Sequence, residues 1–265
     1  MLLNSEAVEK KFDIEQSNLL TTSFKHRIDG AVIRNYGNLL INLSRTVPDN
    51  IVAFFPSYIY MEEIVSIWSK TNIIKEIVKG KLVFIETPNL NETNIALRNF
   101  RKCGENGRGA ILFCVDRGKV SEGVDFEGCY GRAAVMLGVP FMHTESVRIN
   151  ERLKYLFDEY GIEEYDFLLF DAMRHAAQCL GRVIRNKNDY GLMILADHRF
   201  NAKDKKENLP KWIKERIEDG NIGLSIDMAV SIAKHFFRTM AQPLESNETT
   251  LINEKDLTKI FANKK

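Results

Sequence analysis

Five short apolar segments recur along the chain, and polar segments with helical spacing lie between them. The apolar segments cover residues 51–55, 81–87, 109–115, 133–141 and 191–197. Each is a nearly continuous apolar run, which is typical of strands that are buried on both faces of a parallel sheet. Apolar strands that alternate with helices predict an α/β fold, in which helices cover both faces of the sheet.

Helical periodicity predicts the elements between these strands. Residues Met61, Ile64, Val65 and Trp68 recur at i, i+3, i+4 and i+7, and Ser57 is a suitable N-cap for that helix. Residues 93–104 predict a short helix ended by Gly104, and residues 146–160 and 171–185 predict two more. Near the C-terminal end an amphipathic helix is predicted from a four-residue repeat of Met228, Ile232, Phe236 and Met240.

The segment DAMRHAAQCLGRVIR, residues 171–185, divides into two stripes. The apolar stripe contains Met173, Ala176, Ala177, Leu180, Val183 and Ile184, whereas the polar stripe contains Gln178, Gly181, Arg182 and Arg185. Guanidinium groups match phosphate oxygens bidentately and stay charged at any working pH. The polar stripe therefore suits a polyanion, and the alternative is that both arginines are solvated surface charges.

A second cluster, GKVSEGVDFEG at residues 118–128, directly follows the third predicted strand. In parallel sheets, ligands bind outside the carboxyl ends of the strands. Glycines there permit close approach of backbone N–H groups to nucleotide or nucleic-acid phosphates. The alternative is a surface loop in which Asp125 caps a turn.

Charge limits the part of the surface that can contact nucleic acid. The net charge is +1, so there is no global basic field. One local candidate for a phosphate groove is the segment 98–119, although a solvated face would give the same pattern. This segment sets two acidic residues, Glu105 and Asp116, against six basic ones: Arg98, Arg101, Lys102, Arg108, Arg117 and Lys119.

Several sites and locations are not expected. The four cysteines form no Cys-x-x-Cys pair and the five histidines have no ligand spacing, so we predict no metal site in this chain. The glycine-rich GENGRGA at 104–110 lacks the Gly-Lys-Ser/Thr ending of a P-loop. If the chain handles ATP, it supplies one wall of the site. No signal peptide or membrane-spanning run is recognisable, which predicts a cytosolic or nuclear protein.

Three segments resemble motifs of the XPD-type iron–sulfur DNA helicases of superfamily 2. QCLGRVIR at 178–185 is similar to motif VI, GKVSEGVDF at 118–126 is similar to motif V, and IVAFFPSY at 51–58 is similar to the motif IV region. The resemblance runs from about Phe24 to Pro243 and includes two long runs, RGKVSEGVDF and DAMRHAAQC.

The resemblance implies a domain organisation. Residues 24–220 would form the second RecA-like motor domain, and residues 221–265 a helical C-terminal extension and tail. Residues 1–23 match the family poorly. Members of the family hydrolyse ATP between two RecA-like domains and move 5′ to 3′ on single-stranded DNA.

The resemblance also implies roles for single residues. Arg182 and Arg185 would be the catalytic arginines that reach the γ-phosphate. ATP contacts would come from Gln178, Gly181, Gly123 and Asp125. DNA contacts would come from Ser121, Glu122, Phe141, Arg117 and Lys119.

Cofactors and partners follow from the same resemblance. ATP and Mg²⁺ would be shared with a first motor domain, which also carries the P-loop and the iron–sulfur cluster, so this chain is expected to be inactive alone. Implied partners are single-stranded DNA, that first domain and the TFIIH regulatory subunit with a von Willebrand-type domain. The apolar face at 228–240 would dock this subunit or pack on its own domain. No membrane partner is expected.

The resemblance places the protein in the nucleus, in nucleotide excision repair and transcription initiation. Two alternatives remain at this stage: a non-catalytic structural module of a TFIIH-like complex, and a related repair helicase outside TFIIH. The sequence leaves open whether Met1 is a true start, a truncation or one part of a split gene, and what residues 1–23 do.

Overall fold

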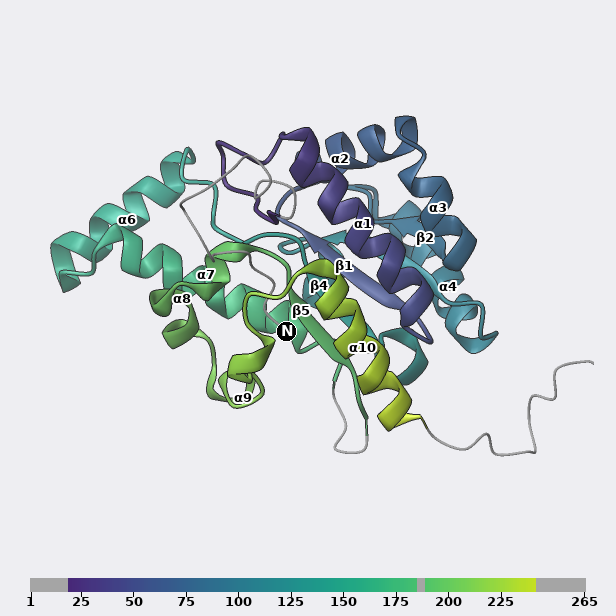
Figure 1. Ribbon diagram of the computed structural model, residues 1–265. Helices are drawn as coiled ribbons and strands as arrows, with labels where there is room; N and C mark the ends of the chain where they lie inside the picture. The colour runs from purple at the N-terminus through teal and green to yellow at the C-terminus, as the bar shows by residue number, and fades with distance from the viewer. Residues whose placement is uncertain (1–18, 185–188, 242–265) are drawn as a thin grey trace, which may run out of the picture.

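A five-stranded parallel sheet forms the centre of the molecule (Figure 1). The computed structural model describes residues 19–184 and 189–241. The strand order is β2 (Leu82–Ile85), β3 (Ala110–Val115), β1 (Ile51–Phe55), β4 (Ala133–Met136) and β5 (Leu192–Leu195). Every pairing between neighbours is parallel. The prediction of a parallel α/β sheet is therefore confirmed.

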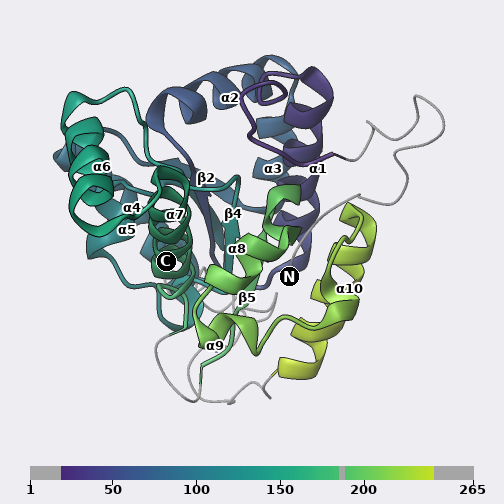
Figure 2. The ribbon, with the colours of Figure 1, turned by 90° about the vertical axis from the view of Figure 1, so that its left-hand side faces the viewer.

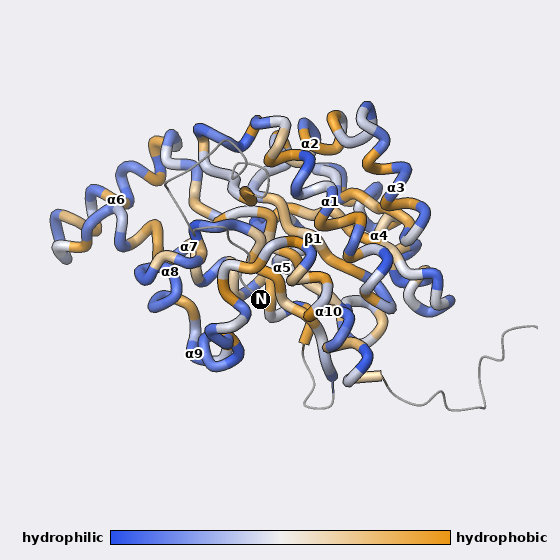
Figure 3. The backbone as a smooth tube through the Cα atoms, in the orientation of Figure 1, coloured by the Kyte–Doolittle hydropathy of each residue, from blue (hydrophilic) through white to orange (hydrophobic). Residues whose placement is uncertain are grey.

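Alternate residues of each strand face opposite cores, because side chains alternate across a sheet. In β1, Ala53 and Phe55 belong to one core, whereas Val52 and Phe54 belong to the other. All four are buried, which explains why this strand is apolar at every position. Figure 3 shows the strands as mostly hydrophobic tube inside a shell whose outer turns are hydrophilic.

Helices cover both faces of the sheet, as Figure 2 shows from the side. The first core is closed by α1 (Gly30–Thr46), α2 (Tyr58–Lys70), α3 (Ile73–Gly80) and α10 (Ile226–Met240). The second is closed by α4 (Leu90–Glu105), α5 (Lys119–Gly123) and α7 (Glu164–Leu180). Two short helices, α8 (Lys203–Asn208) and α9 (Lys211–Lys214), lie next to α7, whereas α6 (Val147–Tyr160) projects from the body. None of the helices within the described ranges is long and apolar enough to span a membrane.

The predicted helix start at Ser57 is confirmed, because its side chain accepts a hydrogen bond from the Tyr60 N–H. The predicted end of a helix at Gly104 is wrong, since α4 continues to Glu105. A Cβ atom at Gly104 would lie 2.9 Å from the Cys129 carbonyl oxygen. This glycine therefore allows close packing and does not end the helix.

Helix α1 was not predicted, although its spacing is regular. The buried residues Val32, Tyr36, Leu39 and Leu43 lie on one face, and Asp29 caps its first turn by accepting from the Ala31 N–H. Helix α3 was likewise not predicted.

Helix α10 packs on α1 and confirms the predicted amphipathic helix, but its most buried residues are not those of the predicted stripe. The buried residues of α10 are Ile226, Ala229, Val230, Ala233 and Phe237. Met228, which starts the predicted stripe, is 56% exposed. A four-residue repeat drifts around a helix of 3.6 residues per turn, so Met228 lies outside the packed face, whereas Ile232 and Phe236 are partly buried against the first core. The apolar face of this segment mainly covers its own domain.

Candidate functional site

The turn after α7 carries the arginine pattern, but the helix ends earlier than predicted. Helix α7 stops at Leu180, and the Gly181 N–H donates to the Ala177 carbonyl at 2.9 Å. The predicted helix over 171–185 is therefore wrong beyond Leu180, and Gly181 is a C-cap residue. Gln178 lies on the helix and Arg182 lies in the turn, whereas Arg185 lies outside the described residues. The apolar stripe is confirmed, since Met173, Ala176, Ala177, Leu180 and Val183 are buried.

Arg182 connects this turn to the segment after β3. Its Nε donates to the Ser121 carbonyl at 2.9 Å and its Nη2 to the Glu122 carbonyl at 2.8 Å. Its Nη1 lies 3.0 Å from Oδ1 of Asp125. The two carbonyls belong to the C-terminal turn of α5, where a cation stabilises the helix end. The Arg182 side chain is consequently only 14% exposed.

The main chain reinforces the same connection. The Phe126 N–H donates to the Arg182 carbonyl at 2.9 Å. Segments some 60 residues apart are thus joined through both a side chain and the backbone. Among the residues predicted to bind ATP or DNA, this arrangement brings Ser121, Glu122 and Asp125 to Arg182.

Exposure differs among the residues of this segment. Ser121 is buried, and its Oγ donates to the Gly118 carbonyl at 2.8 Å. Gly123 is exposed, and nothing lies within 4 Å of a Cβ atom built there. The Glu122 and Asp125 side chains are also exposed. The surface that this segment offers to a ligand is therefore formed by residues 122–125.

A carboxylate fills the position at the start of α5 where the sequence suggested a phosphate. Oε1 of Glu86 accepts from the Val120 N–H at 3.2 Å and from the Tyr58 hydroxyl at 2.8 Å. Its Oε2 accepts from the Val115 N–H at 2.9 Å. A Cβ atom at Gly118 would lie 2.6 Å from Glu86. The close approach that Gly118 permits is therefore to Glu86, which sequence reasoning did not single out.

Arg117 is held on the second face of the same sheet edge. Its Nη2 donates to the Pro140 carbonyl at 2.9 Å and to Oδ2 of Asp171 at 2.6 Å. Burial alone would raise the pKa of Asp171, but hydrogen bonds from Arg174 and Arg117 outweigh burial and lower this pKa. Arg117 is thus fixed in place by α7 and by the chain after β4.

Two other predicted DNA contacts lie near this edge. The Lys119 ammonium donates to the Pro88 carbonyl at 2.7 Å and remains exposed. Phe141 is half-buried against the second core. Both residues follow the carboxyl ends of strands, which is where the sequence predicted them.

Asp116, at the end of β3, is a buried acid that the sequence did not single out as a site residue. Burial raises the pKa of its carboxyl to about 7, although the neighbouring Arg117 opposes this shift. Its Oδ1 has no hydrogen-bond partner within the described part of the chain. The backbone carbonyl of Asp116 lies 3.4 Å from the Cys179 sulfur on α7.

A fourth buried acid, Asp197, lies at the same edge of the sheet, after the carboxyl end of β5. It follows β5 and accepts hydrogen bonds from the Thr22 N–H at 2.8 Å and from Nη2 of Arg199 at 2.7 Å. A Cβ atom at Gly138, whose φ is +115°, would meet the Thr22 side chain. Residues just before α1 therefore cover the carboxyl ends of β4 and β5, so the more open part of this edge lies toward β3.

Gln178 lies in a groove of its own. The groove, of about 420 Å³, runs between α7 and the α8–α9 segment. It is lined by Phe170, Arg174, Ala177, Gln178, Asn208, Pro210 and Trp212. A Cβ atom at Gly181 would lie 3.7 Å from Trp212, so Gly181 borders the same groove. The predicted polar stripe is thus divided between this groove and the Arg182 connection.

The basic segment 98–119 does not form one groove. Arg108 precedes β3 and donates to the Val78 carbonyl at the end of α3. Arg117 and Lys119 follow β3, so the whole strand, about 20 Å long, separates them from Arg108. Arg98 and Lys102 are exposed on α4. Within residues 19–184 and 189–241, no group of three or more His, Cys, Asp or Glu side chains could hold a metal ion.

Comparison with known families gives one match to a family model. The model of the helicase C-terminal domain matches residues 40–216, which is about two thirds of the chain. This range includes the segment after β3 and the turn after α7.

Individual relatives agree with the family match. The protein named general transcription and DNA repair factor IIH helicase subunit XPD of Schizosaccharomyces pombe is 53% identical over 86% of this chain and 30% of its own length. A subunit with the same name from Arabidopsis thaliana is 51% identical over 91% of this chain and 32% of its own length. The Drosophila virilis homolog of regulator of telomere elongation helicase 1 is 32% identical over 85% of this chain and 23% of its own length. The chain thus spans about a third or less of the length of these relatives.

Solved structures give the same fold. A chain titled XPD_Helicase aligns with a TM-score of 0.55 at 20% identity, covering 75% of this chain and 33% of its own length. Another, titled XPD_APO, aligns with a TM-score of 0.53 at 22% identity, over 72% and 36% of the two chains. The predicted RecA-like α/β fold is confirmed.

Proposed function

Since this chain belongs to the helicase C-terminal domain family, we propose that it is the second motor domain of an ATP-dependent, 5′-to-3′ DNA helicase of the XPD type. The observation that carries the proposal is the connection made by Arg182. It joins residues 121–126 to the end of α7, and these are the two segments that resemble motifs V and VI. These contacts would couple a change at either segment to the other.

The residues at this connection fit a nucleotide phosphate. A guanidinium has five N–H groups, and three nitrogens of Arg182 each donate once to the loop. One hydrogen on Nη1 and one on Nη2 therefore remain for an anion. Together with Arg185 they would present positive charge to the γ-phosphate, and an arginine in this role is worth about 10³- to 10⁵-fold in rate.

The other half of the site comes from a first motor domain with a P-loop. Magnesium-bound ATP supplies the phosphoryl group when it is held between the two domains. This chain would contribute Gln178, Gly181, Gly123 and Asp125 as nucleotide contacts and would exclude water when the domains close. Alone, the chain would not hydrolyse ATP, because its own residues stabilise charge but do not cradle the phosphates.

DNA would cross the carboxyl edge of the sheet next to the nucleotide site. Arg117 and Lys119 would bind backbone phosphates, and Phe141 would stack on a base. Ser121 and Glu122 lie on the segment that Arg182 holds, so their role would be to couple nucleotide state to the DNA path. The hydrogen bonds of Arg117 to Asp171 and Pro140 support a fixed position for its charge.

The relatives favour a role in a TFIIH-type complex. Those named as TFIIH subunits are about 50% identical to this chain, whereas the telomere helicase homologs are about 31% identical. We therefore propose a nuclear role in nucleotide excision repair and transcription initiation. The proposed partners are the first motor domain, single-stranded DNA and the von Willebrand-type regulatory subunit, with the exposed side of α10 around Met228 as its contact.

ATP hydrolysis by a reconstituted pair tests this proposal. The chain would be mixed with a separately expressed P-loop half of an XPD-type helicase, and single-stranded-DNA-stimulated hydrolysis would be compared with that of each half alone. The proposal predicts activity only in the mixture. If the two halves bind each other and the mixture is inactive, the non-catalytic structural module is the better account.

A further inference from the structure

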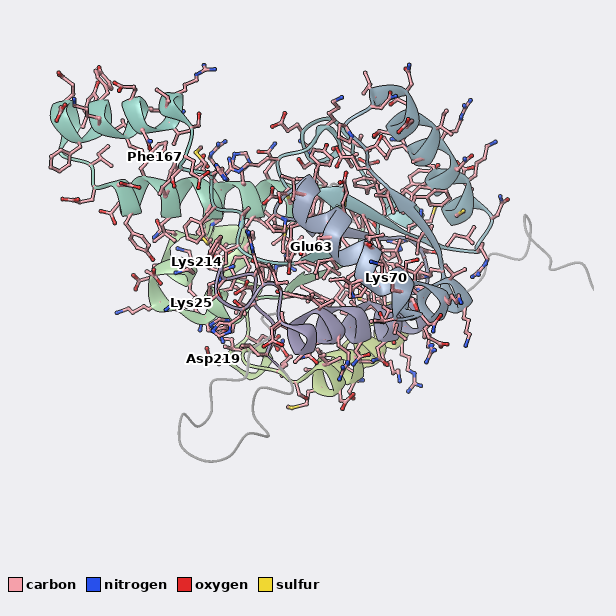
Figure 4. The ribbon with its side chains drawn as sticks, turned by 90° about the horizontal axis from the view of Figure 1, so that it is seen from above. Lys25, Glu63, Lys70, Phe167, Lys214 and Asp219 are labelled. Carbon is pink, nitrogen blue, oxygen red and sulfur yellow. The ribbon has the colours of Figure 1, made fainter. Side chains whose placement is uncertain are left out.

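The tip of the α6–α7 hairpin, residues 155–164, projects from the body of the molecule (Figure 1). Leu153 is the only buried residue among the fourteen of α6. The base of the hairpin is held by Arg152, whose guanidinium lies 5.1 Å from the Phe167 ring centroid. Figure 4 shows Phe167 on this hairpin, at the margin of the molecule. The segment beyond it contributes little to the core.

Aromatic side chains gather on the hairpin tip. Tyr155, Phe157 and Tyr160 are 56%, 54% and 65% exposed, and Ile162 is also exposed. The Tyr155 and Tyr160 rings meet edge to face at 6.0 Å, so they form one surface. Several large apolar side chains exposed next to one another are typical of an interaction surface.

The hairpin tip is also acidic. It contains Asp158, Glu159, Glu163 and Glu164 and no basic residue. Within the described part of the chain, none of these four carboxylates forms an ion pair. Tyr165 just beyond the tip is different, because its hydroxyl hydrogen-bonds to Asp204 on α8. The hairpin tip therefore ends where contact with α8 begins.

We propose that the hairpin tip docks a basic amphipathic segment of a partner protein. Aromatic side chains would anchor the apolar side of that segment, and the four carboxylates would attract its Lys and Arg side chains. The same carboxylates repel nucleic acid and the equivalent tip of a second copy, so neither is the fitting occupant. This surface lies apart from the Arg182 connection, and the inference does not depend on ATP hydrolysis.

A defined peptide probes this surface. The probe is a fluorescein-labelled amphipathic peptide of about twelve Leu and Lys residues in helical register, and the matched peptide carries Glu in place of Lys. Fluorescence anisotropy measures binding of each to the full chain. The wild-type chain should bind the Leu–Lys peptide, more weakly as salt rises, and should not bind the Leu–Glu peptide.

Two sets of variants locate the binding. Asp158→Lys with Glu159→Lys reverses charge at the hairpin tip and should weaken binding at least about tenfold, as should Phe157→Ala through loss of an anchor. Glu62→Lys with Glu63→Lys makes the same charge change on exposed positions of α2, away from the hairpin, where Figure 4 shows Glu63. This control should bind like the wild type.

Three results would overturn the proposal. One is that the wild-type chain does not bind the Leu–Lys peptide. A second is that the α2 control loses as much affinity for this peptide as the hairpin-tip variants do. The third is self-association of the chain, seen by sedimentation, that the tip variants abolish, because it would assign the surface to a second copy. Unchanged thermal melting of each variant confirms that the comparison concerns binding and not folding.

Discussion

Nη1 of Arg182, in the turn after α7, lies 3.0 Å from Oδ1 of Asp125, in the loop after α5. Each nitrogen of the guanidinium donates one hydrogen bond: Nε to the Ser121 carbonyl, Nη2 to the Glu122 carbonyl and Nη1 to this carboxylate. The arginine therefore has a structural role before any ligand binds. If Arg182 also contacts the γ-phosphate, as proposed, nucleotide binding would act on the loop that this arginine holds.

Replacing Arg182 should lower stability as well as activity. Arg182→Ala removes three hydrogen bonds and leaves partly buried carbonyls, so we expect a loss of about 2 kcal/mol in the free energy of unfolding. Arg182→Lys keeps the charge but not the three-nitrogen geometry, so its free energy of unfolding should lie between those of the wild type and Arg182→Ala. Chemical denaturation measures the free energy of unfolding of both variants. Arg98→Ala, at an exposed arginine of α4, is the control and should change stability by less than about 0.5 kcal/mol. Equal effects at the two positions would contradict the role of Arg182.

Glu86 should be essential to the segment after β3. Glu86→Ala leaves the Val115 and Val120 N–H groups and the Tyr58 hydroxyl without their acceptor, which should cost about 3 kcal/mol. Tyr58→Phe removes only one of these hydrogen bonds and should cost about 1 kcal/mol. Urea denaturation of both variants tests the difference. If the two losses are alike, the carboxylate does not organise the start of α5.

Asp116 should make stability depend on pH. Burial raises the pKa of its carboxyl from 3.8 to about 7, so the folded state binds this proton more tightly than the unfolded state does. The resulting penalty is absent below about pH 4, grows as pH rises toward 7 and is complete above it. Asp116→Asn should therefore stabilise the protein at pH 8 by about 2–4 kcal/mol relative to its effect at pH 4.

Denaturation of wild type and variant across this pH range gives the difference. Asp219→Asn, at an exposed acid, is the matched control and should show no such trend. A constant difference between wild type and Asp116→Asn at every pH would show that Asp116 titrates at an ordinary pKa in the folded protein.

The packed face of α10 can be tested by two truncations. Phe237 is buried against the first core, whereas Met228 is mostly exposed. Phe237→Ala should lower the free energy of unfolding by about 3 kcal/mol, and Met228→Ala by less than about 0.5 kcal/mol. Thermal melting distinguishes them. A larger loss for Met228→Ala than for Phe237→Ala would instead support the stripe that the four-residue repeat predicts.

Strands and their carboxyl ends could be predicted because burial on both faces leaves continuous apolar runs. The segment 51–55 was predicted with its observed bounds. The predicted runs at 133–141 and 191–197 are longer than the strands, because residues 137–140 and 196–197 stay buried after the chain leaves the sheet. Apolar character alone does not separate a strand from a buried loop.

The helix ends and the buried acids could not be predicted in the same way. Periodicity continues through Gly181 and Arg182, although the hydrogen bonds of an α-helix stop at Leu180. Glu86 appears in sequence as an ordinary polar residue after a strand, and only the fold brings it to Val120. Motif resemblance predicts a role for Arg182, but its hydrogen bonds to the Ser121 and Glu122 carbonyls depend on tertiary structure.

The central claim is that this chain supplies arginines to an ATP site shared with a P-loop half, and kcat of the mixed halves tests it most directly. Arg185→Ala should lower the DNA-stimulated kcat by about 10³-fold or more, with binding of the two halves unchanged. Lys187→Ala, two residues away, is the control and should retain kcat. A mixture that contains Arg185→Ala and turns over at the wild-type rate would contradict the account.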